Sequence, residues 1–299
     1  MNDGADILHS KLKQNKILRV AGAFDAMSAK LVETNNFDAI WAGSFAISAT
    51  HALPDASILT MTEFLSVASN MTDACSIPVI ADCDTGFGGP SNVSHMVKKY
   101  ESAGIAAISI EDKVFPKQNS LLEDGNQKLL SEKDFVAKII AAKNSKMNEN
   151  FMIIARVEAL IAGLGVDEAI KRADAYEKAG ADAILIHSKK NTPDEIFEFC
   201  DTWNGKIPII AIPTSYPNVT LDELQNHKVK MVIYANQSLR ASHWAMAEHL
   251  GKLSIAKSLS DVETKMTAME DIFHLQEMYE IKKQEIDIEK HLKKLGYIN

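Results

Sequence analysis

Acidic side chains gather where two neighbouring hydrophobic segments of the chain end. One segment finishes with Asp82 and Asp84, and the next finishes with Glu111. Asp82 and Asp84 are expected on one face of a strand, because side chains alternate with a period of two and Cys83 then points the other way. Carboxylates this close must share protons, pair with cations or hold a metal. An all-oxygen set suits Mg²⁺, which keeps several waters and takes few protein ligands.

Basic and small residues end other hydrophobic segments. Arg156 ends one and His187 ends another, so both are candidates to supply positive charge and hydrogen bonds to a phosphoryl or carboxylate group. The turn Gly43-Ser44-Phe45 offers backbone N–H groups to an anion. Without these groups, the carboxylates would be interpreted as strand-end ion pairs and helix caps. Together the residues favour a metal-dependent site that binds an anion.

A loop much longer than a usual βα connection follows the acidic segment. It covers residues 113–127, and a helix is expected to begin near Ser131. Ordinary connections of this kind have about 2–6 residues. Long loops at the active face often act as lids. Lys117 and Asn119 are polar groups that such a lid would bring onto a substrate, whereas the alternative is an insertion without function.

Eight short runs rich in Val, Ile and Ala alternate with segments of helical spacing. Their nearly continuous apolar character predicts strands buried on both faces, as in a parallel sheet. Eight alternating units predict an α/β protein, a (β/α)8 TIM-type barrel that spans residues 1–299 as one domain. Barrel enzymes place their active groups where the strands end, at the carboxyl face. The predicted strands are 17–24, 39–44, 77–84, 106–112, 151–158, 183–188, 207–213 and 231–236.

Composition and charge exclude several classes of protein. The 299 residues are 46% hydrophobic and 24% charged, which provides for a large core. The net charge of −8, without a basic stripe between aromatic residues, argues against nucleic-acid binding. The three cysteines show no CxxC spacing, so a zinc site or a disulfide framework is not expected. With neither a signal peptide nor a membrane-spanning run, a cytoplasmic enzyme is predicted.

The chain changes character after about Leu253. Residues 263–293 form a long, charged and amphipathic stretch that is expected to be an extended C-terminal helix. A closed barrel leaves such a helix little to cover, so one interpretation is that it packs against another subunit as an oligomerisation helix. The other interpretation is that it covers the bottom of its own barrel. Its apolar residues include Met266, Ile272, Leu275, Met278 and Ile281.

Five segments together resemble the phosphoenolpyruvate mutase/isocitrate lyase superfamily. They are ADCDTGFG at 81–88, IEDKVFPKQNSL at 110–121, IIARVEALIAGLG at 153–165, GADAILIHSKK at 180–190 and YAN at 234–236. The resemblance extends from about Ile17 to the C-terminal helix. It implies a Mg²⁺-dependent barrel enzyme that acts on a small molecule. It also implies a homotetramer, a dimer of dimers, in which the C-terminal helix is swapped between subunits.

The long loop decides which branch of the superfamily the sequence resembles. Isocitrate and methylisocitrate lyases carry a KKCGH-type motif there, whereas this loop has no cysteine and is similar to the phosphonate branch. That branch contains mutases, isomerases of phosphonate biosynthesis that interconvert phosphoenolpyruvate and phosphonopyruvate. It also contains phosphonopyruvate hydrolases, which give pyruvate and phosphate.

Lys117 and Asn119 match the Lys-x-Asn of the mutases, whereas hydrolases tend to carry Thr at the position of Asn119. The segments 51–61 and 155–165 are at least as similar to the hydrolases. The resemblance therefore favours a mutase. A hydrolase is the alternative, and a carbon–carbon lyase is a more distant one.

The resemblance also implies roles for individual residues. Asp82 would bind Mg²⁺ directly, while Asp84 and Glu111 would hold it through water. Backbone amides of Ser44 and Phe45 would bind the substrate carboxylate, and Phe45 stands where mutases often have Leu. The implied catalytic residues are Asp55, Lys117, Asn119, Arg156 and His187. The implied substrate-binding residues are Trp41, Gly43, Ser44, Phe45, Leu121 and Ser188.

Overall fold

The computed structural model describes residues 4–125, 127–263 and 266–298. Its internal contacts divide the chain into two compact units, Met1–Arg240 and Ala241–Asn299. Among the described residues, none of the helices combines the length and the hydrophobicity that a membrane span needs.

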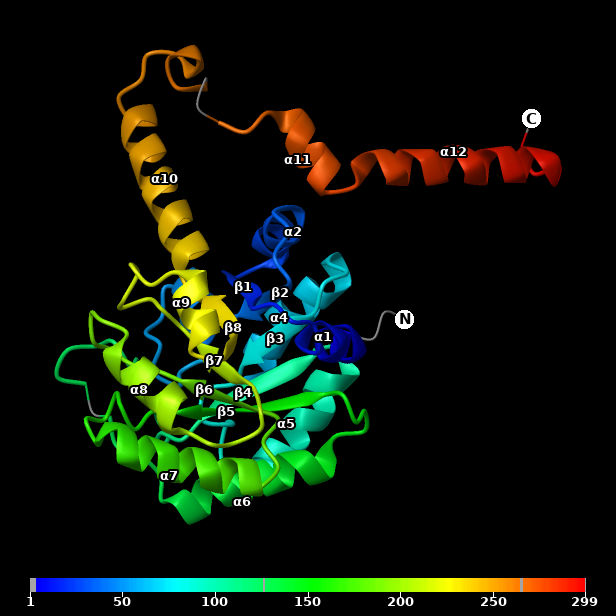
Figure 1. Cartoon of the computed structure of the whole chain (residues 1–299). Coiled ribbons are helices and arrows are strands. Elements are labelled where there is room, and N and C mark those ends of the chain that lie inside the picture. The colour runs from blue at the N-terminus through cyan, green and yellow to red at the C-terminus, as the bar shows by residue number, and fades with distance from the viewer. Residues whose placement is uncertain (1–3, 126, 264–265, 299) are drawn as a thin grey trace. The chain divides into compact units, whose positions relative to one another are not determined.

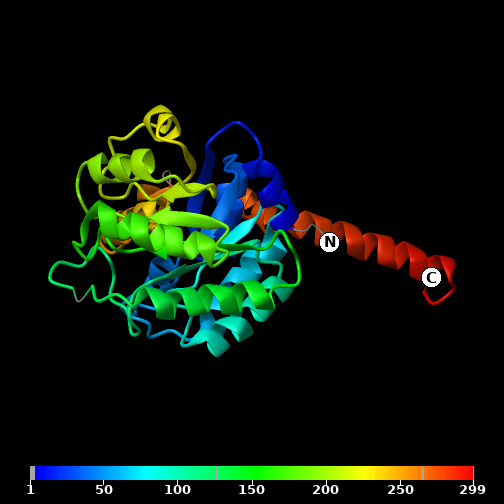
Figure 2. The ribbon, with the colours of Figure 1, turned by 60° about the horizontal axis from the view of Figure 1, so that its bottom comes forward.

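Eight parallel strands close into a barrel in the first unit, which confirms the predicted (β/α)8 fold (Figures 1 and 2). Each strand pairs with the next along the chain, and β1 pairs with β8 to close the ring. Seven of the eight predicted runs contain a whole strand and are longer than it, whereas the last strand begins two residues before the run at 231–236. The strands are β1 Leu18–Ala23, β2 Ala39–Ala42, β3 Val79–Asp82, β4 Ala107–Glu111, β5 Met152–Val157, β6 Ala183–Ile186, β7 Ile209–Ala211 and β8 Val229–Tyr234.

Side chains of the strands alternate between two buried layers. On β5, Ile154 belongs to the cluster that fills the barrel, whereas Ile153 and Ala155 belong to the cluster between strands and helices. Both faces of the sheet are therefore covered, which explains why the strand sequences read as continuous apolar runs. The inner layer, which includes Trp41 and Ile80, forms the floor beneath the carboxyl ends of the strands.

Local signals in the sequence set where the helices begin and end. Asp25 caps α2 by accepting a 2.7 Å hydrogen bond from the Ser28 N–H, and Ser131 caps α6, as the sequence predicts. After α7, Gly180 has a φ of +101° and turns the chain toward β6. The helices are α1 Gly4–Leu12, α2 Ala26–Thr34, α3 Ser44–Thr50, α4 Met61–Ala74, α5 Pro90–Ser102, α6 Glu132–Ser145, α7 Gly165–Lys178, α8 Asp194–Thr202, α9 Leu221–Asn226 and α10 Gln237–Leu253.

The C-terminal stretch is divided into two helices rather than one. They are α11 Met269–Leu275 and α12 Met278–Lys294, preceded by the short 3-10 helix η1 Leu259–Asp261. Between them Glu277 has a φ of 57°, a left-handed conformation that a continuous helix excludes. The expectation of a single helix over 263–293 is therefore wrong at this position. Part of that range, residues 264–265, lies outside the described residues.

Candidate active site

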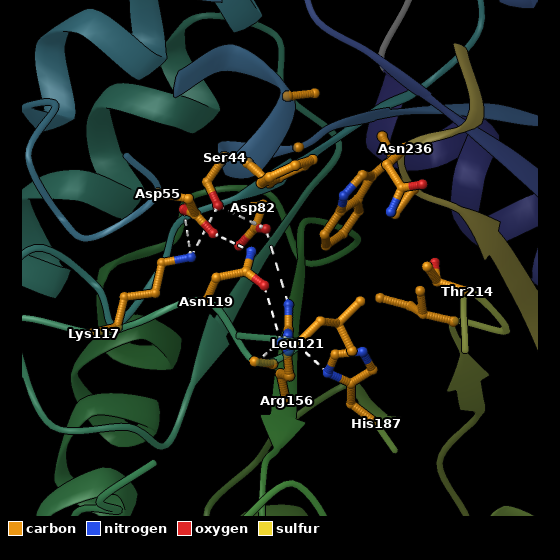
Figure 3. A pocket seen from close by; sticks show the side chains of 17 residues that line it. Ser44, Asp55, Asp82, Lys117, Asn119, Leu121, Arg156, His187, Thr214 and Asn236 are labelled. Carbon is orange, nitrogen blue, oxygen red and sulfur yellow. Dashed lines mark hydrogen bonds and ion pairs between the residues drawn. The ribbon is translucent and has the colours of Figure 1, made fainter. Parts of the chain in front are cut away.

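A cavity of about 170 Å³ opens among the carboxyl ends of the strands (Figure 3). Its lining comes from the ends of β2, β3, β5, β6, β7 and β8 and from the long loop after β4. A space of this volume suits a small organic acid rather than a dinucleotide. The lining residues are Trp41, Gly43, Ser44, Phe45, Ala46, Asp55, Asp82, Lys117, Asn119, Ser120, Leu121, Arg156, His187, Ile212, Thr214, Ala235 and Asn236.

The long loop after β4, which the sequence predicts to be a lid, contributes Lys117, Asn119, Ser120 and Leu121 to the lining of this cavity. Lys113 and Leu129 form an isolated antiparallel bridge that brings the two ends of the loop together. Within the loop, the Lys117 N–H donates to Ser57 Oγ at 3.1 Å, and Asn119 Nδ2 donates to Asp55 Oδ2 at 2.7 Å. The lid is thus attached to the loop between α3 and α4.

Lys117 lies between two buried carboxylates. Its Nζ is 2.7 Å from Asp55 Oδ1 and 3.0 Å from Asp84 Oδ1 (Figure 3 shows the first pair). Burial alone would lower the pKa of Lys117, but Asp84, Glu111 and Asp55 raise it well above its usual value. Burial alone would raise the pKa of Asp55, but Lys117 and Asn119 hold it below its usual value. Both groups are therefore ionised at neutral pH.

A turn, not a strand, places Asp84 beside Asp82. Strand β3 ends at Asp82, and Asp84 has a left-handed φ of 49°. The expectation that both carboxylates follow the alternation of one strand is therefore wrong, although the Asp84 N–H does donate to Asp82 Oδ1 at 3.3 Å. Ser44 Oγ donates to the other oxygen of Asp82 at 3.0 Å. Cys83 points into the outer core, as expected.

Two carboxylates near the ends of β3 and β4 have oxygens that lack hydrogen-bond partners among the described residues. Asp84 Oδ2 and Glu111 Oε1 are buried, and neither has a hydrogen-bond partner among the described residues. Burial raises the pKa of Asp84 to about 6 and that of Glu111 to about 7. A nearby divalent cation would favour the ionised forms.

The spacing of these carboxylates matters as much as their charge. No three His, Cys, Asp or Glu side chains in the described part of the chain are arranged as a direct chelating set. The oxygens of Asp82, Asp84 and Glu111 are nonetheless of the kind that Mg²⁺ prefers, since this ion binds through one or two carboxylates and retains waters.

Arg156 and His187 share the carboxylate of Glu158. Glu158 Oε1 lies 2.5 Å from Arg156 Nε and 3.0 Å from His187 Nδ1. Arg156 NH2 also approaches His187 Nδ1 at 2.9 Å, so Nδ1 donates to Glu158 in the tautomer that carries a hydrogen on this nitrogen and accepts from Arg156 in the other tautomer. Burial and the charge of Arg156 lower the pKa of His187, which favours the neutral ring. Arg156 is directed toward the carboxylates, with Nε 3.4 Å from Glu111 Oε2 and NH1 4.0 Å from Asp82 Oδ2.

Comparison with known proteins assigns the chain to a family. The family profile described as phosphoenolpyruvate phosphomutase matches residues 8–254. The chain belongs to this family. It is 43% identical over 270 residues to the phosphonopyruvate hydrolase of Variovorax sp. (strain Pal2), which covers 90% of this chain and 93% of that protein.

Two solved structures are similar over almost their whole length. One is the phosphoenolpyruvate phosphomutase from Streptomyces platensis subsp. rosaceus, with a TM-score of 0.93, 43% identity and coverage of 95% of this chain and 99% of that chain. The other is a phosphonopyruvate hydrolase in complex with oxalate and Mg²⁺, with a TM-score of 0.89, 39% identity and coverage of 95% and 98%. The phosphoenolpyruvate phosphomutase family fold therefore accommodates both reactions.

Most residues that the family resemblance implicates lie together in the cavity. Asp84 and Glu111 lie behind its lining, where they contact Lys117 and Arg156. Ser188 is not among the lining residues, since its hydroxyl donates to Glu195 in the first turn of α8. Its position does not support a contact with substrate. The implicated residues that do line the cavity are Trp41, Gly43, Ser44, Phe45, Asp55, Asp82, Lys117, Asn119, Leu121, Arg156 and His187.

Several residues of the site were missed by reasoning from the sequence. Thr214 and Asn236 line the cavity after β7 and β8, and Thr214 Oγ1 and Asn236 Oδ1 are buried with no hydrogen-bond partner in the part of the chain that the structure describes. Glu158 is the last residue of a predicted strand, and the sequence did not indicate that its carboxylate contacts both Arg156 and His187. The rule that active groups follow barrel strands pointed to all three positions, but their residue types are common in structural roles.

The cysteine side chains do not reach the cavity, although Cys83 stands between Asp82 and Asp84 in the sequence. Cys83 and Cys200 are buried in the outer core, and Cys75 is half-buried below it. None of them is among the residues that line the cavity. Acid–base chemistry by a lid cysteine, which the resemblance associates with the lyases, thus has no counterpart in the part of the lid that the structure describes.

Proposed function

We propose that the protein is a phosphoenolpyruvate mutase, an isomerase that interconverts phosphoenolpyruvate and phosphonopyruvate and thereby serves phosphonate biosynthesis. The observation that carries the proposal is the contact of Asn119 and Lys117 with Asp55 inside a small covered cavity. The same two residues supply the Lys-x-Asn that resembles mutases. A covered cavity also favours transfer within one molecule, because water would otherwise capture the phosphoryl group.

Different residues of the cavity bind the two ends of the substrate, its carboxylate and its phosphoryl group. Helix α3 begins at Ser44, so the N–H groups of Ser44 and Phe45 are free of helical partners and suit the substrate carboxylate. Arg156, His187 and Asn119 then hold the phosphoryl group. Phosphoryl transfer has a loose transition state, so the work of the protein is positioning and charge stabilisation.

Mg²⁺ is the cofactor that we propose for this site. Asp82 would hold it directly, with Asp84 and Glu111 behind intervening waters. When bound, it supplies positive charge that makes the enolate of pyruvate a better leaving group. Ser44 fixes the orientation of Asp82 by its 3.0 Å hydrogen bond, while Lys117 pairs with both Asp84 and Asp55.

Hydrolysis of phosphonopyruvate is the alternative, and the 43% identity to a phosphonopyruvate hydrolase supports it. The two reactions need the same binding groups and differ in whether water reaches the phosphoryl group. The test is ³¹P NMR of the purified protein with Mg²⁺ and phosphonopyruvate. Appearance of phosphoenolpyruvate supports the mutase, whereas direct formation of phosphate and pyruvate without phosphoenolpyruvate establishes the hydrolase.

We further propose that the protein is a homotetramer of cytoplasmic subunits. On α12, apolar side chains recur at helical spacing and are exposed within the single chain. A second copy that covers this stripe would remove it from water. The three free cysteines fit a reducing compartment. The residues of the stripe are Met278, Ile281, Ile288, Leu292 and Leu295.

A further inference from the structure

A buried lysine lies at the base of the lid, outside the cavity lining. The side chain of Lys113 is 1% exposed, and Glu158, with which it pairs, is 0% exposed. Burying a charge is costly unless the group is paired and fully hydrogen-bonded. The contacts that compensate for the burial of the Lys113 charge therefore show which groups the lysine holds in place.

Lys113 Nζ uses its three donors on two lid residues and one barrel residue. It donates to the Gln118 carbonyl oxygen at 2.9 Å and to Ser120 Oγ at 2.6 Å, and it lies 3.3 Å from Glu158 Oε2. Gln118 and Ser120 are the residues on either side of Asn119. The lysine thus fixes the chain immediately before and immediately after the lid residue that contacts Asp55.

Glu158 divides its two oxygens between the lid and the phosphoryl-binding groups. Its Oε2 accepts from Ser120 Oγ at 2.6 Å, while its Oε1 contacts Arg156 and His187. Ser120 Oγ also accepts from Arg156 NH2 at 3.0 Å. One buried carboxylate therefore connects the position of the lid to the position of Arg156.

We propose that Lys113 and Glu158 are positioning residues, a latch that holds Asn119 over the cavity in register with Arg156. This proposal rests on the proposed function for its catalytic consequence. When the latch is formed, the Asn119 amide and the Arg156 guanidinium face the same cavity at fixed separation. When it is broken, the lid admits water and the phosphoryl group is lost to phosphate.

The test is Lys113→Met, which keeps much of the side-chain length and removes the charge. Hydrogen–deuterium exchange of the protein without substrate should become faster in residues 114–125, while the strands of the barrel keep their protection. With Mg²⁺ and phosphonopyruvate, kcat should fall about 10- to 100-fold, as expected for a displaced catalytic group. The share of product found as phosphate by ³¹P NMR should rise. Lys128→Met, in the same loop but outside the cavity, is the matched control and should change none of these quantities.

Ser120→Ala is the second variant, for the case that Lys113→Met does not fold. It removes only the hydroxyl that Lys113, Glu158 and Arg156 share, and it should still fold. Hydrogen–deuterium exchange in the lid should become faster in this variant, but less so than in Lys113→Met. Unchanged exchange in the lid of the folded variants would overturn the latch. The exchange experiment contains no substrate, so it decides on the latch even if the wild-type protein proves to form no phosphoenolpyruvate.

Discussion

The side-chain amide of Asn119 donates a 2.7 Å hydrogen bond to Asp55 Oδ2, which joins the lid to the loop between α3 and α4 inside the cavity. Replacement of Asn119 by Ala should lower kcat about 100-fold, because the lid then lacks a group that orients the phosphoryl end of the substrate. The free energy of unfolding should change by no more than about 1 kcal/mol, which is the net contribution of one hydrogen bond. Steady-state kinetics and calorimetry measure the two effects.

Exposed Asn204 provides the control, since Asn204→Ala leaves the cavity intact. Asn119→Thr addresses the choice between the two reactions. It should increase the fraction of phosphonopyruvate that ends as phosphate. A rate unaffected by Asn119→Ala would remove this residue from the site.

Loss of the carboxylate of Asp82 should abolish both Mg²⁺ binding and Mg²⁺-dependent turnover. This residue lies at the end of β3 and lines the cavity, and Ser44 fixes its orientation. Isothermal titration of Mg²⁺ into Asp82→Ala measures binding apart from catalysis. Asp167→Ala, on the exposed side of α7, should bind Mg²⁺ as the wild type does. Retained Mg²⁺-dependent activity in Asp82→Ala would contradict the metal assignment.

Asp38 should make the stability of the barrel depend on acid pH. Burial alone would raise the pKa of Asp38, but hydrogen bonds from Lys16, the Arg19 N–H and Lys11 hold it below its usual value. A lowered pKa in the folded state stabilises the protein above the unfolded pKa of about 3.9, and this contribution is lost as the pH falls through the folded value. Asp38→Asn should therefore cost about 1–2 kcal/mol at pH 7.

The wild type and Asp38→Asn should differ less in unfolding free energy near pH 3.5 than at pH 7. Urea titrations at the two pH values measure this difference. An unfolding difference that stays constant between them would show that the carboxylate contributes through packing and not through its charge.

The apolar stripe of α12 should hold subunits together. Two acidic substitutions on it, Ile281→Glu and Ile288→Glu, would place charges in a covered interface and should lower the molar mass measured by light scattering. Glu285→Gln, on the same helix, serves as the control. A monomeric wild-type protein would rule out the proposed tetramer.

The barrel was predictable because the same sequence pattern, an apolar run followed by a segment of helical spacing, occurs eight times. Continuous apolar runs such as 151–158 can be buried on both faces only when helices surround a parallel sheet. The lid was predictable from its length after β4. These features depend on the pattern of many residues and not on any one side chain.

Individual contacts followed less well from the sequence. Asp84 reaches the site through a left-handed turn, which the alternation of a strand cannot predict. Ser188 was expected to bind substrate, but its hydroxyl donates to Glu195, a partner that only the fold brings near. Glu158 became visible as a member of the site only when Arg156, Ser120 and His187 were placed around it.

The bridge between Lys113 and Leu129 separates the lid from the hydrogen-bond ladder of the barrel. The segment between these two positions can change in length or composition while the strands keep their register. The lid is in this respect an insert whose two ends are joined to each other independently of the strands. A chimera that carries the insert of another relative should therefore keep the barrel folded, while the groups that the insert presents to the cavity change.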